Sequence, residues 1–462
     1  MRHGMRAVAA AAALALAPPA GAAFFDREEA VDHALNHNPQ LDASQASISA
    51  AEEDLEAARS GGSAQVELTA SGSASNNPLD AFSHKLQAGN IEADMTSQPP
   101  DLGDFDPDEL NNPDPSFLTS TGVEVRYPLY TGGRVSAGID GAESAREAAE
   151  FGHLRTREVI AYQTRRAYLA VQAAERGLAI AKDAVAAARE HAETTRRLVR
   201  DGRIVESDQL TAEVNLNEME AKRDQAAERV HRARNQLRRV MGLDRNESLE
   251  VAELPSIDET PELAELATLQ TEALDHRRDL RSLRAQKAAQ MAQKDMEEAA
   301  YGPQFNLVAS GNTYGEGSAY DNTAWRAMAQ VSYQLWDGGT ASSKAAAARE
   351  RAERVRAEIA SREQEIRSEV RQAVDAIEMA RTRLENSRGT VDRARENVAQ
   401  VERRYGQGRT MLIDLLQAEG RLVKARNEVL GARQALQAGR LDLATAQGRL
   451  LEEDSSDSRG MR

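Results

Sequence analysis

The sequence contains two copies of one long repeat. Tyr127, Tyr130, Gly132 and Gly133 recur 206 positions later as Tyr333, Trp336, Gly338 and Gly339. The same offset carries Gly202 and Asp208 onto Gly408 and Asp414. Upstream of Ser75 the offset is 239, so a 33-residue insertion separates the copies in the loop after that residue. Two copies of one unit predict a duplicated architecture, and the content of the unit decides the function.

Each copy holds long helices. Large apolar residues recur every seven positions near the C-terminus, and small residues recur beside them with the same period, as in a coiled-coil seam. The large row is Leu415, Leu422, Val429, Leu436, Leu443 and Leu450, and the small row is Ala418, Ala425, Ala432, Gly439 and Ala446. Residues 135 to 200 and 340 to 404 lack proline and predict helices of about 65 residues, roughly 100 Å long. Shorter helices are expected over residues 27 to 59, 208 to 241, 262 to 299 and 410 to 451.

Four short stretches alternate apolar and polar residues and predict β-strands. They cover residues 64 to 75, 119 to 130, 304 to 313 and 324 to 336, with Val308 as an exception to the alternation. Such strands fit either a small soluble sheet with one wet face or the wall of a water-filled membrane barrel. Four strands cannot close a membrane barrel, because small barrels need about eight and lipid does not tolerate an open edge. In the membrane interpretation, several chains must therefore combine their strands.

The remaining segments divide the chain. Residues 1 to 23 have the layout of a secretory signal peptide, residues 24 to 261 form the first repeat, and residues 262 to 451 form the second. Residues 76 to 119 are acidic and rich in proline, so we expect a long solvent loop there that buries no core. A connector is expected over residues 242 to 261, and residues 452 to 462 form a polar tail.

Composition excludes several functions. The chain has no cysteine, which rules out disulfides and thiolate metal sites. Its net charge of −16 argues against nucleic acid as a partner. No phosphate-binding Gly-x-x-x-x-Gly-Lys motif and no credible catalytic triad occur, so we expect no enzyme activity and no cofactor. His33 and His37 have the spacing of a helical metal pair, but a solvated helix face is the favoured interpretation, and no metal site is predicted.

The order of these elements resembles the TolC-type outer-membrane efflux protein family over essentially the whole chain after residue 23. The resemblance rests on the strand ends Tyr127-Pro128-Leu129-Tyr130-Thr131-Gly132-Gly133 and Gln334-Leu335-Trp336-Asp337-Gly338-Gly339, and on the two glycine tips. It implies a mainly α-helical chain with four strands, and a homotrimer with a twelve-stranded outer-membrane barrel and a twelve-helix periplasmic tunnel. It also implies a passive channel of a tripartite efflux or type I secretion system. The partners would be a periplasmic adaptor, an inner-membrane ABC or proton-driven transporter, and outer-membrane lipid.

Two groups of candidate functional residues follow. Gly202 and Gly408 stand where a long helix must reverse, and Asp208 and Asp414 follow on the opening turn of each return helix. These acids either complement the helix dipole or, as the resemblance implies for Asp414, line the periplasmic entrance. In the second case Asp414 would set cation selectivity, and Arg409 and Asp208 would help to tie neighbouring hairpins. The family often has a second acid three residues later, where this chain has Gln417. Tyr127, Tyr130, Tyr333 and Trp336 at the strand ends are candidates for an interfacial aromatic belt.

Two other interpretations remain. A periplasmic coiled-coil adaptor is disfavoured because it carries one hairpin, whereas two hairpins and four strands are expected here. An enzyme or adhesin on a helical stalk would need a catalytic cluster or a large exposed domain, and only the loop over residues 76 to 119 is available. The cargo, whether protein, drug or metal ion, is not encoded in any motif.

Overall fold

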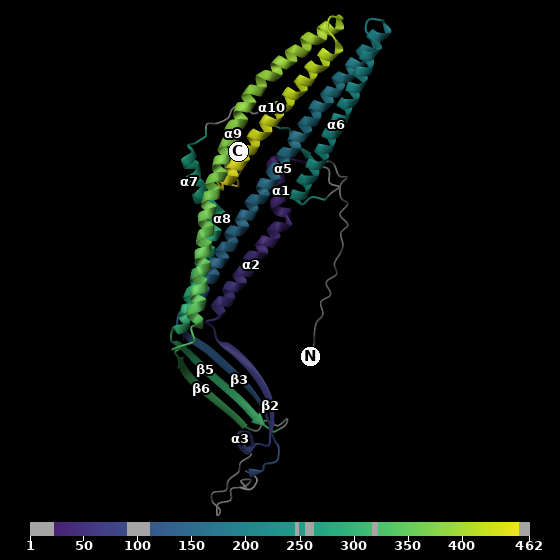
Figure 1. Ribbon diagram of the computed structural model, residues 1–462. Coiled ribbons are helices and arrows are strands. Elements are labelled where there is room, and N and C mark those ends of the chain that lie inside the picture. The colour runs from purple at the N-terminus through teal and green to yellow at the C-terminus, as the bar shows by residue number, and fades with distance from the viewer. Residues whose placement is uncertain (1–22, 90–110, 245–248, 255–262, 317–321, 452–462) are drawn as a thin grey trace, which may run out of the picture. The chain divides into compact units, whose positions relative to one another are not determined.

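A computed structural model describes residues 23 to 89, 111 to 244, 249 to 254, 263 to 316 and 322 to 451 (Figure 1). These residues form two compact units. The first unit takes in the chain up to Ala46, Phe151–Arg281 and the chain from Ala360, and the second takes in Ser47–Glu150 and Ser282–Ile359. Residues 1 to 22 of the expected signal peptide, residues 90 to 110 of the expected acidic loop, and the polar tail lie outside the described residues.

Helices make up most of the chain. Two of them, α5 (Arg134–Arg200) and α9 (Thr340–Gly406), are 67 residues long. The others are α1 (Arg27–His37), α2 (Pro39–Ser60), α3 (Pro78–Ala88), α6 (Glu206–Met241), α7 (Leu266–His276), α8 (Arg278–Glu298), a 3-10 turn η1 (Ala299–Tyr301) and α10 (Leu412–Ala446). In the part of the chain that the structure describes, no helix is both long and apolar enough to cross a membrane.

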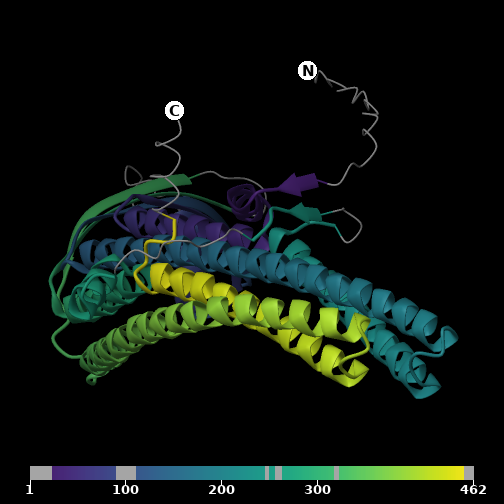
Figure 2. The ribbon, with the colours of Figure 1, turned by 90° about the horizontal axis from the view of Figure 1, so that it is seen from above.

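In the first unit each long helix reverses into its return helix, so that α5 lies beside α6 and α9 beside α10 (Figures 1 and 2). The predicted seam of α10 is buried. All five small residues of the seam are buried, as are Leu415, Leu436, Leu443 and Leu450 of the large row, while Leu422 and Val429 are half-buried. A Cβ on Gly439 would lie 2.9 Å from Cγ1 of Ile377 on α9, so the small row allows close packing of the two helices.

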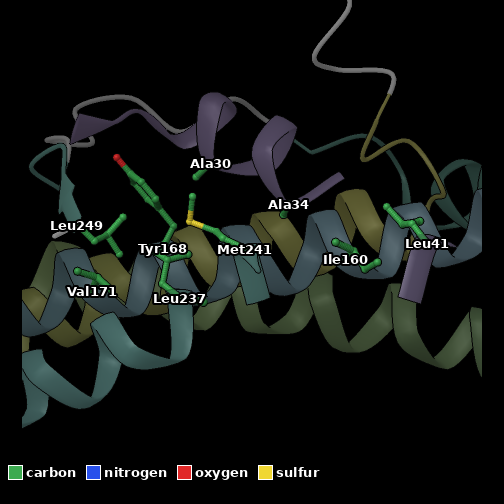
Figure 3. Packing of buried hydrophobic residues seen from close by; sticks show 10 residues of the cluster. Ala30, Ala34, Leu41, Ile160, Tyr168, Val171, Leu237, Met241 and Leu249 are labelled. Atoms are coloured by element: carbon green, nitrogen blue, oxygen red, sulfur yellow. The ribbon is translucent and has the colours of Figure 1, made fainter. Parts of the chain in front are cut away.

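The main core of the first unit surrounds Tyr168 on α5 (Figure 3). Its ring packs among buried residues of α1, α6 and the short strand β4 (Leu249–Val251), which include Ala30, Leu237 and Leu249. Its hydroxyl donates a hydrogen bond to the carbonyl of Phe25 at 3.0 Å and accepts one from the amide of Ala252 at 2.8 Å. Phe25 ends strand β1 (Ala23–Phe25), which pairs in parallel with β4. The tyrosine therefore holds the start of the first repeat against the connector.

The second unit contains a four-stranded antiparallel sheet in the order β2-β3-β5-β6. The strands are β2 (Gln65–Ser75), β3 (Ser116–Thr131), β5 (Gln304–Gly315) and β6 (Asn322–Ser332). The predicted last strand ran to residue 336, but β6 ends at Ser332. That residue pairs with Gln304, the first residue of β5, and Pro303 before it has no N–H to extend the ladder.

The prediction that residues 76 to 119 bury no core is wrong for the part that is described. Residues 78 to 88 form the helix α3, which begins with Asn77 as its N-cap and ends at Gly89 with φ 80°. Its Ala81, His84 and Ala88 are buried. Strand β3 also begins at Ser116, three residues before the predicted start. The prediction rested on the overall composition of the segment, which is acidic and rich in proline. This short stretch differs, because its proline lies in the first helical turn and Ala81, His84 and Ala88 form a buried stripe.

The duplication is visible in equivalent helix breaks. The first helix of each repeat is interrupted, at Asn38 between α1 and α2 and at Arg277 between α7 and α8. The side chain of Asn38 donates to the carbonyl of Val240 at 3.0 Å, and that of Arg277 donates to the carbonyl of Ala446, its counterpart, at 3.4 Å. Both predicted single helices, 27 to 59 and 262 to 299, are therefore broken, and each break is tied to the end of its own return helix.

Candidate functional site

The sheet has one apolar and one polar face. The register places Leu68, Val123, Gly311 and Trp325 in one row across all four strands, and the neighbouring row on the other face holds Glu67, Glu124, Ser310 and Arg326. The apolar face is exposed within the chain: Leu68 is 72% and Trp325 83% accessible. Val308 and Met328 pair on the polar face, which explains the exception in the alternation. An exposed apolar face of this kind marks a surface that contacts lipid or protein.

A β-bulge sets the aromatic residues at the end of β3. The register shifts between Pro128 and Tyr130, so Tyr127 pairs with Leu307 and Tyr130 pairs with Phe305. Because Leu307 and Phe305 lie on one face, the bulge brings both tyrosines to the apolar face despite their odd spacing. The rings of Tyr130 and Phe305 are 6.0 Å apart. Tyr333 and Trp336 follow the end of β6 and are exposed.

The Gly-Gly pairs at the strand ends start the two long helices. Gly132 and Gly133 have φ values of 66° and 91°, and Gly338 and Gly339 have values of 73° and 85°. In the first copy the Thr131 hydroxyl accepts a hydrogen bond from the amide of Val135 at 3.2 Å. In the second copy, Asp337 accepts hydrogen bonds from the amides of Gly339 and Ala341 at 2.9 and 2.6 Å. These motifs are therefore strand-to-helix turns with N-caps, in which left-handed φ values favour glycine.

The hairpin tips have the same backbone turn in both copies. Gly202 and Gly408 each have φ 69°. The amide of Arg203 donates to the carbonyl of Leu198 at 2.9 Å, and the amide of Arg409 donates to that of Arg404 at 2.8 Å, as in a Schellman motif. The side chain of Arg409 is exposed, so a contact with a neighbouring hairpin stays a prediction.

Asp208 and Asp414 occupy equivalent positions on the first turns of α6 and α10, but their surroundings differ. The Asp414 carboxylate accepts a hydrogen bond from the Thr410 hydroxyl at 2.8 Å and from the Met411 amide at 3.3 Å. Asp414 and Gln417 are exposed, whereas Asp208 is half-buried. The capping role considered for Asp414 is thus present, and its exposure leaves the carboxylate charge directed to solvent.

Two buried contacts join the hairpins within the chain, and neither was predicted. The hydroxyls of Thr195 on α5 and Tyr405 on α9 form a buried hydrogen bond at 2.8 Å. Four residues earlier on α5, His191 forms an ion pair with Glu419 on α10. Burial alone would lower the pKa of His191, but the hydrogen bond and charge of Glu419, with the charges of Glu402 and Glu190, raise it above its usual value. The sequence signal was only a lone histidine and a glutamate 228 positions apart.

A buried ionic cluster lies at the break between α7 and α8. The guanidinium of Arg277, which is fully buried, contacts Asp279 at 2.7 Å and Glu369 on α9 at 2.6 Å. Arg362 also contacts Asp279, at 2.8 Å. Burial alone would raise the pKa of Asp279, but hydrogen bonds and charge from Arg277, followed by Arg155 and Arg362, hold it far below its usual value. The cluster has the character of a structural clamp, because the buried guanidinium of Arg277 joins the start of α8 to α9 through Asp279 and Glu369.

His33 and His37 lie close together without converging on a common point. Their rings are stacked with centroids 4.1 Å apart. Nδ1 of His33 lies 3.2 Å from the carbonyl oxygen of Met241, and Nδ1 of His37 lies 3.0 Å from that of His33. Among the residues placed by the structure, no group of three or more histidine, cysteine or acidic side chains is arranged to hold a metal ion.

Comparison with known proteins decides the family. The model of the outer membrane efflux protein family matches residues 30–243 and 269–449. The chain belongs to this family. A search of curated proteins gave no match. The fold is similar to that of the outer-membrane channel OprN, with 20% identity and a TM-score of 0.75, over 91% of this chain and 89% of that one.

Other solved structures give the same result. The outer membrane protein VceC from Vibrio cholerae is 18% identical with a TM-score of 0.72, over 91% of this chain and 96% of that one. The CmeC outer membrane channel of Campylobacter jejuni is 17% identical with a TM-score of 0.74, over 94% and 88%. The predicted resemblance is confirmed, and the family assignment places the protein in the outer membrane with a part that extends into the periplasm. The matches take in both hairpins and the sheet, which favours a channel over the adaptor considered above.

Proposed function

We propose that the protein is one third of a homotrimeric channel that conducts substrate passively across the outer membrane. The observation that carries this proposal is the four-stranded sheet with one exposed apolar face and with β2 and β6 as edge strands. Unpaired strand edges are not stable in lipid, so the edges of neighbouring copies must pair. Three copies would give twelve strands, which is within the range of membrane barrels. The same three copies would supply twelve long helices, from α5, α6, α9 and α10, as the wall of a periplasmic tunnel.

The proposed channel works with two partners. A periplasmic adaptor and an inner-membrane ABC or proton-driven transporter would deliver the substrate, in a tripartite efflux or type I secretion system. The description of OprN and CmeC as outer-membrane channels supports this role. The protein itself would perform no chemistry and need no cofactor. At the lipid boundary, Tyr127, Tyr130, Tyr333 and Trp336 would form part of an aromatic belt, since all four are exposed at strand ends.

At the hairpin tips, we propose that Asp414 makes the narrow entrance selective for cations. Three carboxylates about 10 Å apart repel by roughly 0.4 kcal/mol per pair in water and by about 1.7 kcal/mol at an effective dielectric constant of 20. This repulsion is small enough for an adaptor to open the ring and large enough to favour cations over anions. Gln417 leaves one acidic ring at this level in place of the two that the family often has.

Two measurements test the proposed function. The mass of the detergent-solubilised protein should be that of a trimer, and a stable monomer that retained its strand signal in circular dichroism would contradict the proposal. In planar bilayers, Asp414→Ala should shift the reversal potential in a salt gradient toward lower cation selectivity. Asp208→Ala, which removes the equivalent acid of the first hairpin, is the matched control and should shift it less. Equal reversal potentials for the two variants and the parent would leave Asp414 with its capping role alone.

A further inference from the structure

The helix α3 lies at the strand ends farthest along the chain from the long helices (Figure 1). Its hydrogen bonds to Ser73 and Ser116 place it on the polar face of the sheet. Strand β2 starts five residues after α2 and ends at Ser75, and β3 starts at Ser116 and ends three residues before α5. The helix follows β2 directly and packs against β3 and β5. Its buried stripe is Ala81, His84 and Ala88, one helical face at spacings of three and four residues.

His84 anchors this helix to two strands at once. Its Nδ1 lies 2.8 Å from the Ser116 hydroxyl on β3, and its Nε2 lies 3.1 Å from the Ser73 hydroxyl on β2. The Ser116 hydroxyl donates its hydrogen bond to the carbonyl of Ser75 at 3.2 Å, so it acts as the acceptor in its contact with Nδ1. Nε2 is within hydrogen-bond distance of the Ser73 hydroxyl, so both ring nitrogens have a partner. Both serines lie on the polar face, because they share the parity of Glu67 and Glu124 in the strand register.

A third strand holds the C-terminal end of α3. The Asn322 side chain on β6 donates to the carbonyl of Gln87 at 2.9 Å. The helix ends two residues later at Gly89, whose left-handed backbone lies against the same asparagine. Contacts with β2, β3 and β6 fix α3 across the whole width of the sheet, so the helix is firmly packed on this face.

The opposite side of α3 carries an exposed apolar stripe. Leu79 and Leu86 are 74% and 56% accessible, and their spacing of seven residues places them on one face. At 100° per residue this face points away from the buried stripe of His84. Two exposed leucines above a polar sheet face are unexpected for a helix that meets only water.

We propose that α3 is a lid inside the outer mouth of the channel, where Leu79 and Leu86 of the three copies form an apolar constriction. This inference rests on the trimer proposed above, because in a barrel the polar sheet face is the lumen wall. A helix on that face lies inside the barrel, and its outward stripe then faces the same stripe of the other two copies. A ring of leucines narrows the pore and disfavours a continuous column of water, which is a known way to gate a channel. The His84 bridge to Ser73 and Ser116 is the attachment that holds the lid in place.

Labelling of single cysteines tests the lid in intact cells. The chain has no cysteine, so Thr69→Cys and Leu68→Cys each introduce the only thiol. Position 69 lies on the polar face, four residues or roughly 13 Å along β2 from Ser73, and position 68 lies on the apolar face. The probe is a membrane-impermeant maleimide coupled to polyethylene glycol and added outside the cells. Labelling at position 69 should be slow in the chain that carries only Thr69→Cys. The rate should be about tenfold higher when Leu79→Ser and Leu86→Ser are added together, or when His84→Ala is added.

The controls separate the lid from the channel. Leu79→Ile and Leu86→Ile keep the apolar stripe and should leave the labelling rate unchanged. If His84→Ala fails to form trimers, the serine variants test the lid, since both leucines are exposed in the chain. A labelling rate at position 69 that is the same in every variant, with position 68 unlabelled, would overturn the lid and leave the channel intact. Equal labelling at positions 68 and 69 would overturn the assignment of the sheet faces, and the proposed barrel with it.

Discussion

Replacement of Arg277 by methionine should be among the most damaging single changes in the helical unit. The side chain is fully buried, and it makes two hydrogen bonds to Asp279, at 2.9 and 2.7 Å, and one to Glu369 at 2.6 Å. Methionine fills a similar volume but removes the bidentate cationic partner of Asp279, which keeps its contact with Arg362 at 2.8 Å. Removal of one partner from a buried ion pair typically costs about 3 to 5 kcal/mol, because the other charge stays buried without compensation. We expect a loss of unfolding free energy in this range.

The loss of stability at low pH should be smaller in the Arg277→Met variant than in the parent. The pKa of Asp279 is lowered in the folded protein, so its contribution to stability is present above its unfolded pKa of about 3.9 and is lost as the pH falls through the folded value. In Arg277→Met the largest part of this contribution is lost, while Arg155 and Arg362 remain, so the stability should fall less steeply in acid. The double variant Arg277→Met with Asp279→Asn removes both charges. It should be more stable than the sum of the single effects predicts, by about 1 to 3 kcal/mol.

Denaturant unfolding of the detergent-solubilised protein, followed by the helical signal in circular dichroism, measures these differences. Arg395→Met is the matched control, because Arg395 forms an exposed pair with Asp392 at 3.6 Å on α9. Surface substitutions of this kind stay within about 0.5 kcal/mol. If Arg277→Met were no more destabilising than Arg395→Met, or if the two single changes in the Arg277 pair were additive, the buried cluster would not be the clamp described above.

Two further predictions concern the helix contacts of the first unit. The pair of His191 and Glu419 should stabilise the protein below pH about 6.5 and lose this effect as the pH rises through the raised pKa of the histidine. Glu419→Gln should lower the free energy of unfolding by about 1.5 to 3 kcal/mol at pH 6 and by less at pH 9. An equal loss at both pH values would refute the ionic role. Gly439→Val should lower the free energy of unfolding by about 1 to 3 kcal/mol, because even a Cβ would lie 2.9 Å from Ile377. Gly431→Val is the control: it lies in open space on the same helix and should differ from the parent only by helix propensity. Equal melting temperatures for the two variants would contradict close packing at Gly439.

The features that the sequence could predict are those set by local periodicity. The seven-residue rows of α10 are buried as the spacing of Leu415 and Ala418 indicates, and the alternation in β2 gives two faces, because each pattern depends only on the geometry of its own element. The breaks in the shorter helices were missed for different reasons. Pro39 is a local signal for the first break, but Arg277 has none, and only the offset of 239 from Asn38 could have located it.

The unpredicted contacts depend on residues that are distant in the sequence. His84 joins two strands separated by the insertion, and its role follows from a register that no single stretch contains. His191 and Glu419 meet because two hairpins pack together. Pairings of this kind depend on the tertiary structure, so composition could assign residues 76 to 119 to a loop and still miss a helix that is anchored to three strands.

The two copies keep one backbone and differ in the chemistry placed on it. Gly202 and Gly408 have the same φ and the same turn, yet the first tip has Ile204 where the second has Thr410. Only in the second copy does this position donate a hydrogen bond to the acid of the return helix, Asp414, at 2.8 Å. A held carboxylate has fewer orientations than a free one, so its charge is better defined in space. In the proposed trimer, the hydrogen bond from Thr410 would hold the three Asp414 carboxylates in one orientation, which gives the second hairpin the features of an electrostatic filter.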